Sequence, residues 1–156
     1  MGSLVLRAAS CQDTAFIAEM ARHACVIEDW PLPPADSDEV RSLLPSGDEV
    51  PIIAADSDGV SLGAVWTFHD EPPLLVDATG IPLPELCIGV VPGMRGCGVG
   101  GALLDELFRR RTGEVDALCS NVHVRNPAQK LYQRKGFELV GQGRGPLGLA
   151  MRKELR

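Results

Sequence analysis

The segment that most constrains the fold is the stretch 86–101, where an apolar run leads through a glycine-rich turn into a helical pattern. Residues 86–91 are almost continuously apolar, which predicts a strand buried on both faces. Residues 99–108 then repeat apolar side chains at helical spacing. A helix N-terminus presents unpaired N–H groups and partial positive charge, and glycines let these groups approach an anion. The segment therefore predicts a phosphate-binding turn.

Three phosphate motifs compete for this turn. A Walker loop requires G-x-x-x-x-G-K-[ST], and no Lys-Ser/Thr pair follows these glycines. A dinucleotide fingerprint, G-x-G-x-x-G, fits residues 96–101, but the segment lies in mid-chain and no acidic residue ends a following strand at the expected distance. The pattern R-x-x-G-x-G fits Arg95, Gly98 and Gly100, and the guanidinium adds a full positive charge.

Two segments resemble the motifs of the GCN5-related N-acetyltransferase (GNAT) family. The R-x-x-G-x-G turn is similar to the acetyl-CoA pyrophosphate loop of that family. Residues 126–137, N-P-A-Q-K-L-Y-Q-R-K-G-F, resemble its second motif, N-x-x-A-x-x-L-Y-x-x-x-G-F. The two stand in the family's order and spacing, so the resemblance implies an acetyl-CoA-dependent N-acetyltransferase that acts on a primary amine.

The resemblance also implies which residues hold acetyl-CoA. Backbone groups of Val90 and Val91 would hold the pantetheine arm as an added strand does, although both side chains equally suit core packing. Asn126 would touch the same arm, or serve only as a helix N-cap. The pyrophosphate site would comprise Arg95, Gly96, Cys97, Gly98, Val99 and Gly100.

The same resemblance assigns the chemistry. Tyr132, the only tyrosine, would act as the general acid for the departing thiolate, with core packing as the alternative. Glu85 is the first candidate for the base that takes the amine proton through water, although an exposed glutamate at the start of a strand is an equal alternative. Asn121 and His123 are the second candidates. Direct transfer in a ternary complex requires no cysteine nucleophile.

The order of elements predicts one mixed α/β domain over residues 1–156. Strands are expected at 4–9, 50–55, 60–68, 86–91, 116–124, 137–140 and 147–151. Helices are expected at 13–25, from 36 or 37 to 44, at 98–111 and from 126 to 135. A further short strand is expected at 74–76. The predicted fold is a mostly antiparallel central sheet of six to seven strands flanked by about four helices, as in GNAT enzymes.

Composition limits the remaining function classes. The net charge of −6 disfavours a nucleic-acid partner, and no apolar run reaches the length of a membrane span or signal peptide, so we expect a cytoplasmic protein. Five scattered cysteines and three histidines predict neither disulfides nor a metal site. The expected partner is a small-molecule or protein amine, with a homodimer as the candidate assembly. The alternative function is a non-catalytic acyl-CoA-binding or sensing domain.

Overall fold

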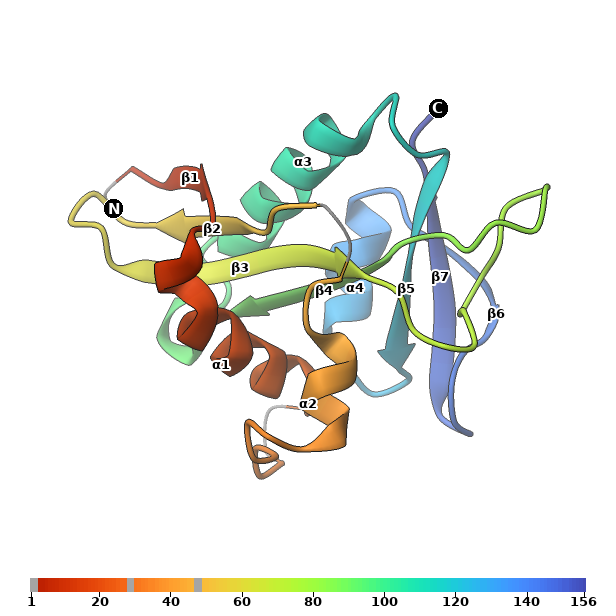
Figure 1. The fold of residues 1–156 in the computed structure, drawn as a ribbon, viewed down its shortest axis with the longest axis horizontal. Coiled ribbons are helices and arrows are strands. Elements are labelled where there is room, and N and C mark those ends of the chain that lie inside the picture. The colour runs from red at the N-terminus through yellow and green to blue at the C-terminus, as the bar shows by residue number, and fades with distance from the viewer. Residues whose placement is uncertain (1–2, 28–29, 47–48) are drawn as a thin grey trace.

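A seven-stranded mixed sheet forms the centre of the computed structural model, which describes residues 3–27, 30–46 and 49–156 (Figure 1). Its spatial order is β1-β2-β3-β4-β5-β7-β6. Only β4 and β5 pair in parallel, whereas every other neighbouring pair is antiparallel. The strands are β1 (Val5–Ala8), β2 (Ile52–Ala55), β3 (Ser61–Phe68), β4 (Glu85–Val90), β5 (Ala117–His123), β6 (Glu138–Gln142) and β7 (Gly148–Glu154).

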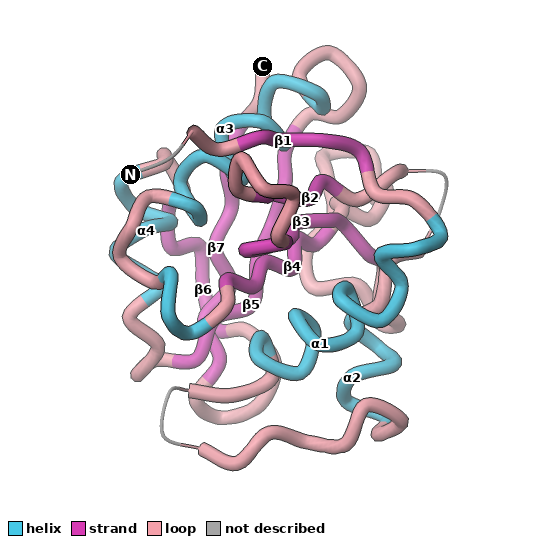
Figure 2. Tube along the Cα trace, turned by 90° about the vertical axis from the view of Figure 1, so that its left-hand side faces the viewer, coloured by secondary structure: helices cyan, strands magenta, loops and turns pink. Residues whose placement is uncertain are grey.

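Four α-helices cover the two faces of this sheet (Figure 2). They are α1 (Thr14–Ala24), α2 (Asp38–Leu43), α3 (Val99–Arg111) and α4 (Ala128–Arg134), and two 3-10 turns lie at Cys11–Asp13 and Pro92–Met94. The alternation of side chains along β2 shows why both faces need cover. Ile52 and Ala54 pack in the core beneath α3, whereas Ile53 packs in the core beneath α1 and α2. In the described part of the chain, no helix has the length and apolar character needed to cross a membrane.

The predicted order of strands and helices is confirmed, and so is the mixed, mostly antiparallel sheet. The predicted hairpin turn is present, since Gly59 has φ +85° and the Asp56 N–H donates to the Val60 carbonyl (3.0 Å). The predicted strand at 74–76 is wrong. That segment contributes only an isolated bridge between Val76 and Pro82, because prolines interrupt the loop and leave no partner strand along it.

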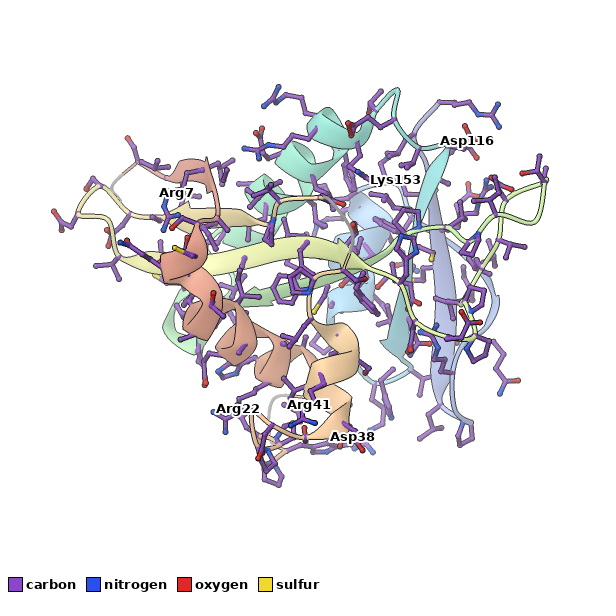
Figure 3. The ribbon with its side chains drawn as sticks, in the orientation of Figure 1. Arg7, Arg22, Asp38, Arg41, Asp116 and Lys153 are labelled. Carbon is purple, nitrogen blue, oxygen red and sulfur yellow. The ribbon has the colours of Figure 1, made fainter. Side chains whose placement is uncertain are left out.

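An ion pair between Arg7 and the buried carboxylate of Asp13 fixes the entry into α1. Arg7 on β1, labelled in Figure 3, donates to both carboxylate oxygens of Asp13 at 2.8 Å. The Ser10 N–H donates to the same carboxylate, which completes a capping box. Asp13 is buried, and the hydrogen bonds from Arg7 lower its pKa to about 2.

We expect Asp13→Asn to lower the free energy of unfolding by about 1–2 kcal/mol at pH 7. Because the folded pKa lies below that of the unfolded chain, the contribution is complete above pH 4 and is lost as the pH falls through 2. Urea denaturation of wild type and variant at pH 7 and at pH 2.5 measures this difference in the free energy of unfolding. Asp36→Asn, in an exposed loop, is the matched control. Equal stability of wild type and Asp13→Asn at pH 7 would contradict the assignment.

Candidate active site

The sheet opens between its two parallel strands. Strand β4 pairs with β3 over six residues, but it pairs with β5 at one position only, Glu85 with Cys119. The Cys119 N–H donates to the Pro84 carbonyl (3.0 Å) at the same point, and the strands diverge beyond it. Along the diverging part, the β4 edge that faces β5 has no ladder partner. This splay leaves backbone groups free to bind a ligand.

A cavity of about 1080 Å³ occupies the gap. Its walls come from β4, β5, the glycine turn before α3, helix α4 and the segment that follows α1. Eight of the predicted site residues line it: Glu85, Val90, Arg95, Gly96, Gly98, Gly100, Asn126 and Tyr132. Three predicted residues, Val91, Cys97 and Val99, do not. The structure thus brings most of the predicted residues of both motifs to one cavity.

The glycine turn presents bare backbone at the start of α3. Gly96 and Gly98 have φ of +79° and +87°, a conformation that residues with side chains rarely adopt. Gly98 precedes the helix and supplies no side-chain cap, so the N–H groups of the first turn have no side-chain acceptor at that position. A side chain at Gly100 is disfavoured for another reason, because an added Cβ would lie only 3.1 Å from Leu131 Cδ2 on α4.

Val91 and Val99 serve the fold rather than the cavity wall. The Val91 N–H donates to the Leu62 carbonyl (2.8 Å) and its own carbonyl accepts from the Met94 N–H (2.9 Å). Hydrogen bonds alternate along an antiparallel strand, so the backbone groups of neighbouring Val90 point toward the open edge instead. Val99 is the first residue of α3, and its side chain is buried in the core between α3 and the sheet. A sequence motif identifies positions such as Val91 and Val99, but it does not show whether the backbone or the side chain of each residue is the part that matters.

Arg95 contacts a residue that the sequence analysis did not single out. Its Nη2 lies 3.4 Å from Nδ1 of His23, near the end of α1, and His23 also lines the cavity. Burial and the nearby guanidinium lower the pKa of His23. The neutral ring can therefore accept a hydrogen bond from Arg95 at neutral pH. The contact spans 72 residues of sequence, and nothing local to either residue signals it.

Tyr132 lies on α4 with 6% of its surface exposed. Its ring packs against Phe137, with 5.3 Å between ring centroids. Burial raises the pKa of the phenol to about 12. Tyr132 is thus both a core residue and a cavity-lining residue whose hydroxyl stays protonated at neutral pH.

Glu85 is not an exposed strand-start glutamate, because only 2% of its surface is accessible and Arg144 holds it. The Arg144 Nη1 donates to Glu85 Oε1 (2.5 Å) and Nη2 donates to Oε2 (2.6 Å). Arg144 lies in the turn between β6 and β7, whose backbone is anchored by a hydrogen bond from its N–H to Asn121 Oδ1 (2.9 Å). Nothing in the sequence marks Arg144, since a lone arginine between two glycines carries no motif.

The two alternative bases are both engaged. The Asn121 side chain accepts from Arg144, and its amide has no lone pair basic enough for proton transfer at neutral pH. His123 Nδ1 accepts the Arg125 N–H (3.1 Å), so the neutral ring carries its proton on Nε2 and keeps no free acceptor nitrogen. The ring also packs edge-on against Trp30 (5.5 Å).

Asn126 makes the predicted capping bond, since its Oδ1 accepts the Ala128 N–H (2.9 Å), although α4 itself begins at Ala128. Its position in the family motif needs correction. The pattern N-x-x-A places an asparagine three residues before the alanine, whereas Arg125 holds that position here and Asn126 follows it. The Asn126 side chain thus caps the start of α4 at the wall of the cavity.

The cavity cysteines are poor nucleophiles. Burial raises the pKa of the Cys87 thiol, and it raises that of Cys25 to about 11. Among the described residues, no three His, Cys, Asp or Glu side chains gather as metal ligands do. Tyr132 and Glu85 are the two candidate catalytic side chains that line the cavity, and Arg144 binds one of them.

The comparisons with known proteins agree with this geometry. Residues 49–139 match the family model for the acetyltransferase (GNAT) domain. This match covers more than half of the chain, and the chain belongs to the GNAT acetyltransferase family. No sequence among curated proteins matches it.

Solved structures share the fold over nearly the full length. A GCN5-related N-acetyltransferase from Kribbella flavida is 24% identical with a TM-score of 0.72, and the alignment covers 97% of each chain. A phosphinothricin acetyltransferase from Sinorhizobium meliloti, solved with AcCoA, is 22% identical with a TM-score of 0.69, covering 97% of this chain and 88% of that one. A ribosomal-protein-alanine N-acetyltransferase from Brucella melitensis is 20% identical with a TM-score of 0.66, covering 96% and 99%. At these identities the likeness establishes the fold.

Proposed function

We propose that residues 1–156 form one acetyltransferase domain that transfers the acetyl group of acetyl-CoA to a primary amine by direct attack. The amine belongs to a small molecule or to a protein. The observation that carries this proposal is the splayed β4–β5 gap, whose cavity joins the glycine turn of α3 to Tyr132 and Glu85. Family membership supports the same reaction class.

The residues at the α3 end of the cavity fit a pyrophosphate. Gly96 and Gly98 hold the turn in its left-handed conformation, and an added Cβ at either would meet no atom within 4 Å, so the space above them is open. The N–H groups of the first helical turn and the Arg95 guanidinium would bind the phosphate oxygens. The free backbone groups of Val90 would hold the pantetheine arm at the open edge of β4.

Tyr132 would stabilise the leaving thiolate. When the amine nitrogen attacks the thioester carbon, the C–N bond forms, the C–S bond breaks, and the sulfur takes the bonding electron pair. The phenol has a pKa of about 12 against about 8.5 for a thiol, so full proton transfer to the thiolate is uphill. The protonated hydroxyl therefore acts chiefly as a hydrogen-bond donor to the sulfur, and solvent supplies the final proton of the CoA thiol.

Glu85 would receive the amine proton through a water molecule. An amine with a pKa near 10 must lose one proton before attack and a second as the amide forms. Each Glu85 oxygen accepts one hydrogen bond from Arg144 and retains a second lone pair. Arg144 thereby holds the orientation of the carboxylate at the cavity wall, and the remaining lone pairs can accept a hydrogen bond from the bridging water.

Binding of acetyl-CoA tests the proposal at the cofactor end. We expect Arg95→Gln to weaken binding about tenfold, because the variant loses a charge-assisted hydrogen bond to the pyrophosphate at an exposed position. Isothermal titration calorimetry measures the dissociation constant. Arg125→Gln, outside the cavity lining, is the control of equal charge change. Equal affinities for wild type and Arg95→Gln would contradict the assignment.

Release of free CoA, followed with a thiol reagent across a panel of amines, tests the reaction itself. Turnover with any amine supports acetyl transfer. Tight acetyl-CoA binding without turnover on any small amine or peptide amine would instead favour the non-catalytic acyl-CoA-binding alternative.

A further inference from the structure

The two ends of the cavity carry opposite charge. At the α3 end the lining includes Arg95 and Arg134, beside the positive N-terminus of the helix. At the other end lie Glu85, Asp70 and Arg144, which are joined by ion pairs. Strand β4 separates the two ends, because Glu85 begins it and Val90 ends it, about 17 Å apart at 3.3 Å per residue. The acceptor amine would therefore meet the Glu85 end.

The one guanidinium at this end is fully committed to the protein. Besides its two hydrogen bonds to Glu85, Arg144 Nη2 donates to the Pro72 carbonyl (3.1 Å), and Nε lies 3.9 Å from Asp70 Oδ2. A substrate carboxylate could gain Arg144 only by taking it from a carboxylate that is almost completely buried. Arg144 therefore provides no binding site for an acidic group on the acceptor.

The remaining formal charge at this end of the cavity is negative. Glu39 lines the same cavity from α2, and it makes no ion pair within the described residues. Asp70 and Glu85 are two carboxylates against the guanidinium of Arg144, so this end carries one formal negative charge in excess, and the Glu39 carboxylate belongs to the lining of the same cavity. A cationic ammonium is attracted to such a surface, and a second carboxylate on the acceptor is repelled.

The wall beside these charges is apolar. Phe68 pairs with Glu85 across β3 and β4 and lines the cavity. Leu43 lines it from α2, four residues after Glu39 and on the same helix face, and its carbonyl accepts from Trp66 Nε1 (2.7 Å). Val26 and Ile27 complete the wall. A hydrocarbon or aromatic body would bury against this surface.

From these contacts we infer that the acceptor is a primary amine with an apolar body and no carboxylate on the carbon that bears the amine. The inference rests on the proposed acetyl transfer and narrows its acceptor class. Alkylamines, arylalkylamines and amide-blocked amino acids belong to this class, whereas free amino acids do not.

A matched set of acceptors tests this inference. Phenethylamine, phenylalanine and phenylalaninamide share one body and differ at the carbon beside the amine, where they carry hydrogen, a carboxylate or a neutral amide. We expect kcat/KM for phenethylamine and phenylalaninamide to exceed that for phenylalanine at least tenfold, with tyramine and tyrosine following the same order. CoA release at saturating acetyl-CoA measures it.

Charge-neutralising variants connect the preference to the cavity. Glu39→Gln leaves the Arg144 network intact. It should lower the ratio of kcat/KM for phenethylamine to kcat/KM for phenylalanine at least twofold. The double variant Glu39→Gln/Asp70→Asn should lower this ratio further. Glu138→Gln, on the exposed strand β6, makes the same charge change outside the cavity and should leave the ratio unchanged.

The outcomes separate the inference from the function on which it rests. If kcat/KM for the free amino acids equals or exceeds that for the matching amines, the acceptor class is wrong and acetyl transfer still stands. The same conclusion follows if Glu39→Gln does not change the ratio of kcat/KM for phenethylamine to that for phenylalanine. Absence of CoA release with every acceptor, by protein that binds acetyl-CoA, overturns the proposed transfer and this inference with it.

Discussion

Replacing Tyr132 with phenylalanine should lower kcat about 100-fold while the dissociation constant for acetyl-CoA changes by no more than about threefold. The hydroxyl is the only group that the substitution removes, and the ring contact with Phe137 is kept. If the phenol donates a hydrogen bond to the sulfur as the C–S bond breaks, losing it raises the free energy of the transition state and hardly changes that of the bound ground state. Steady-state kinetics and calorimetry on the same preparation measure the two quantities.

The pH dependence of kcat provides a second test of the role of Tyr132. Because burial raises the pKa of Tyr132 to about 12, the phenol stays protonated from pH 6 to pH 10, and its ionisation causes no alkaline loss of activity in that range. Wild type and Tyr132→Phe should therefore have profiles of the same shape but different height. Ser120→Ala, which removes a neighbouring hydroxyl of the cavity lining that lowers the pKa of the phenol, is the companion variant and should have a smaller effect. An unchanged kcat in Tyr132→Phe would assign the side chain to packing alone.

The fold could be predicted because each element carries a local signal. The apolar period of residues 99–108 is visible within a single helix, and Asp58-Gly59 marks its hairpin within two residues. The glycine turn is equally local, since Gly96 and Gly98 need positive φ whatever surrounds them. Such features do not depend on distant parts of the chain, and a single sequence suffices to find them.

The Glu85 end of the cavity could not be predicted for the opposite reason. Glu85 and Arg144 are 59 residues apart, and the β6–β7 turn brings the guanidinium to the buried carboxylate. Before Glu85 stands Pro84, and the pair resembles an exposed strand start. The contact of Arg95 with His23 has the same character. Both pairs join residues that carry no motif and lie far apart in the sequence, so only the folded chain reveals them.

The Glu85–Arg144 pair should also account for a large part of the stability of this region. We expect Arg144→Met to lower the free energy of unfolding by about 2–4 kcal/mol, because it leaves a buried carboxylate without its partner. The range lies below that for a fully buried pair because one third of the Arg144 side chain is exposed. Arg152→Met, which breaks an exposed pair with Glu154 (3.1 Å) on β7, is the matched control and should cost no more than about 1 kcal/mol.

A double-mutant cycle decides whether this loss belongs to the ion pair. Glu85→Gln removes the charge that Arg144 compensates, so adding Arg144→Met to that variant should cost less than half of what it costs in wild type. Equal costs in the two backgrounds would mean that the Arg144 side chain stabilises the turn through its hydrogen bond to the Pro72 carbonyl rather than through the carboxylate. Glu85→Gln itself should retain acetyl-CoA binding and lose most of its turnover near neutral pH, since an amide cannot receive the amine proton. A stable Glu85→Gln variant with full turnover would leave Glu85 as the structural partner of Arg144 and would require solvent to take the proton directly.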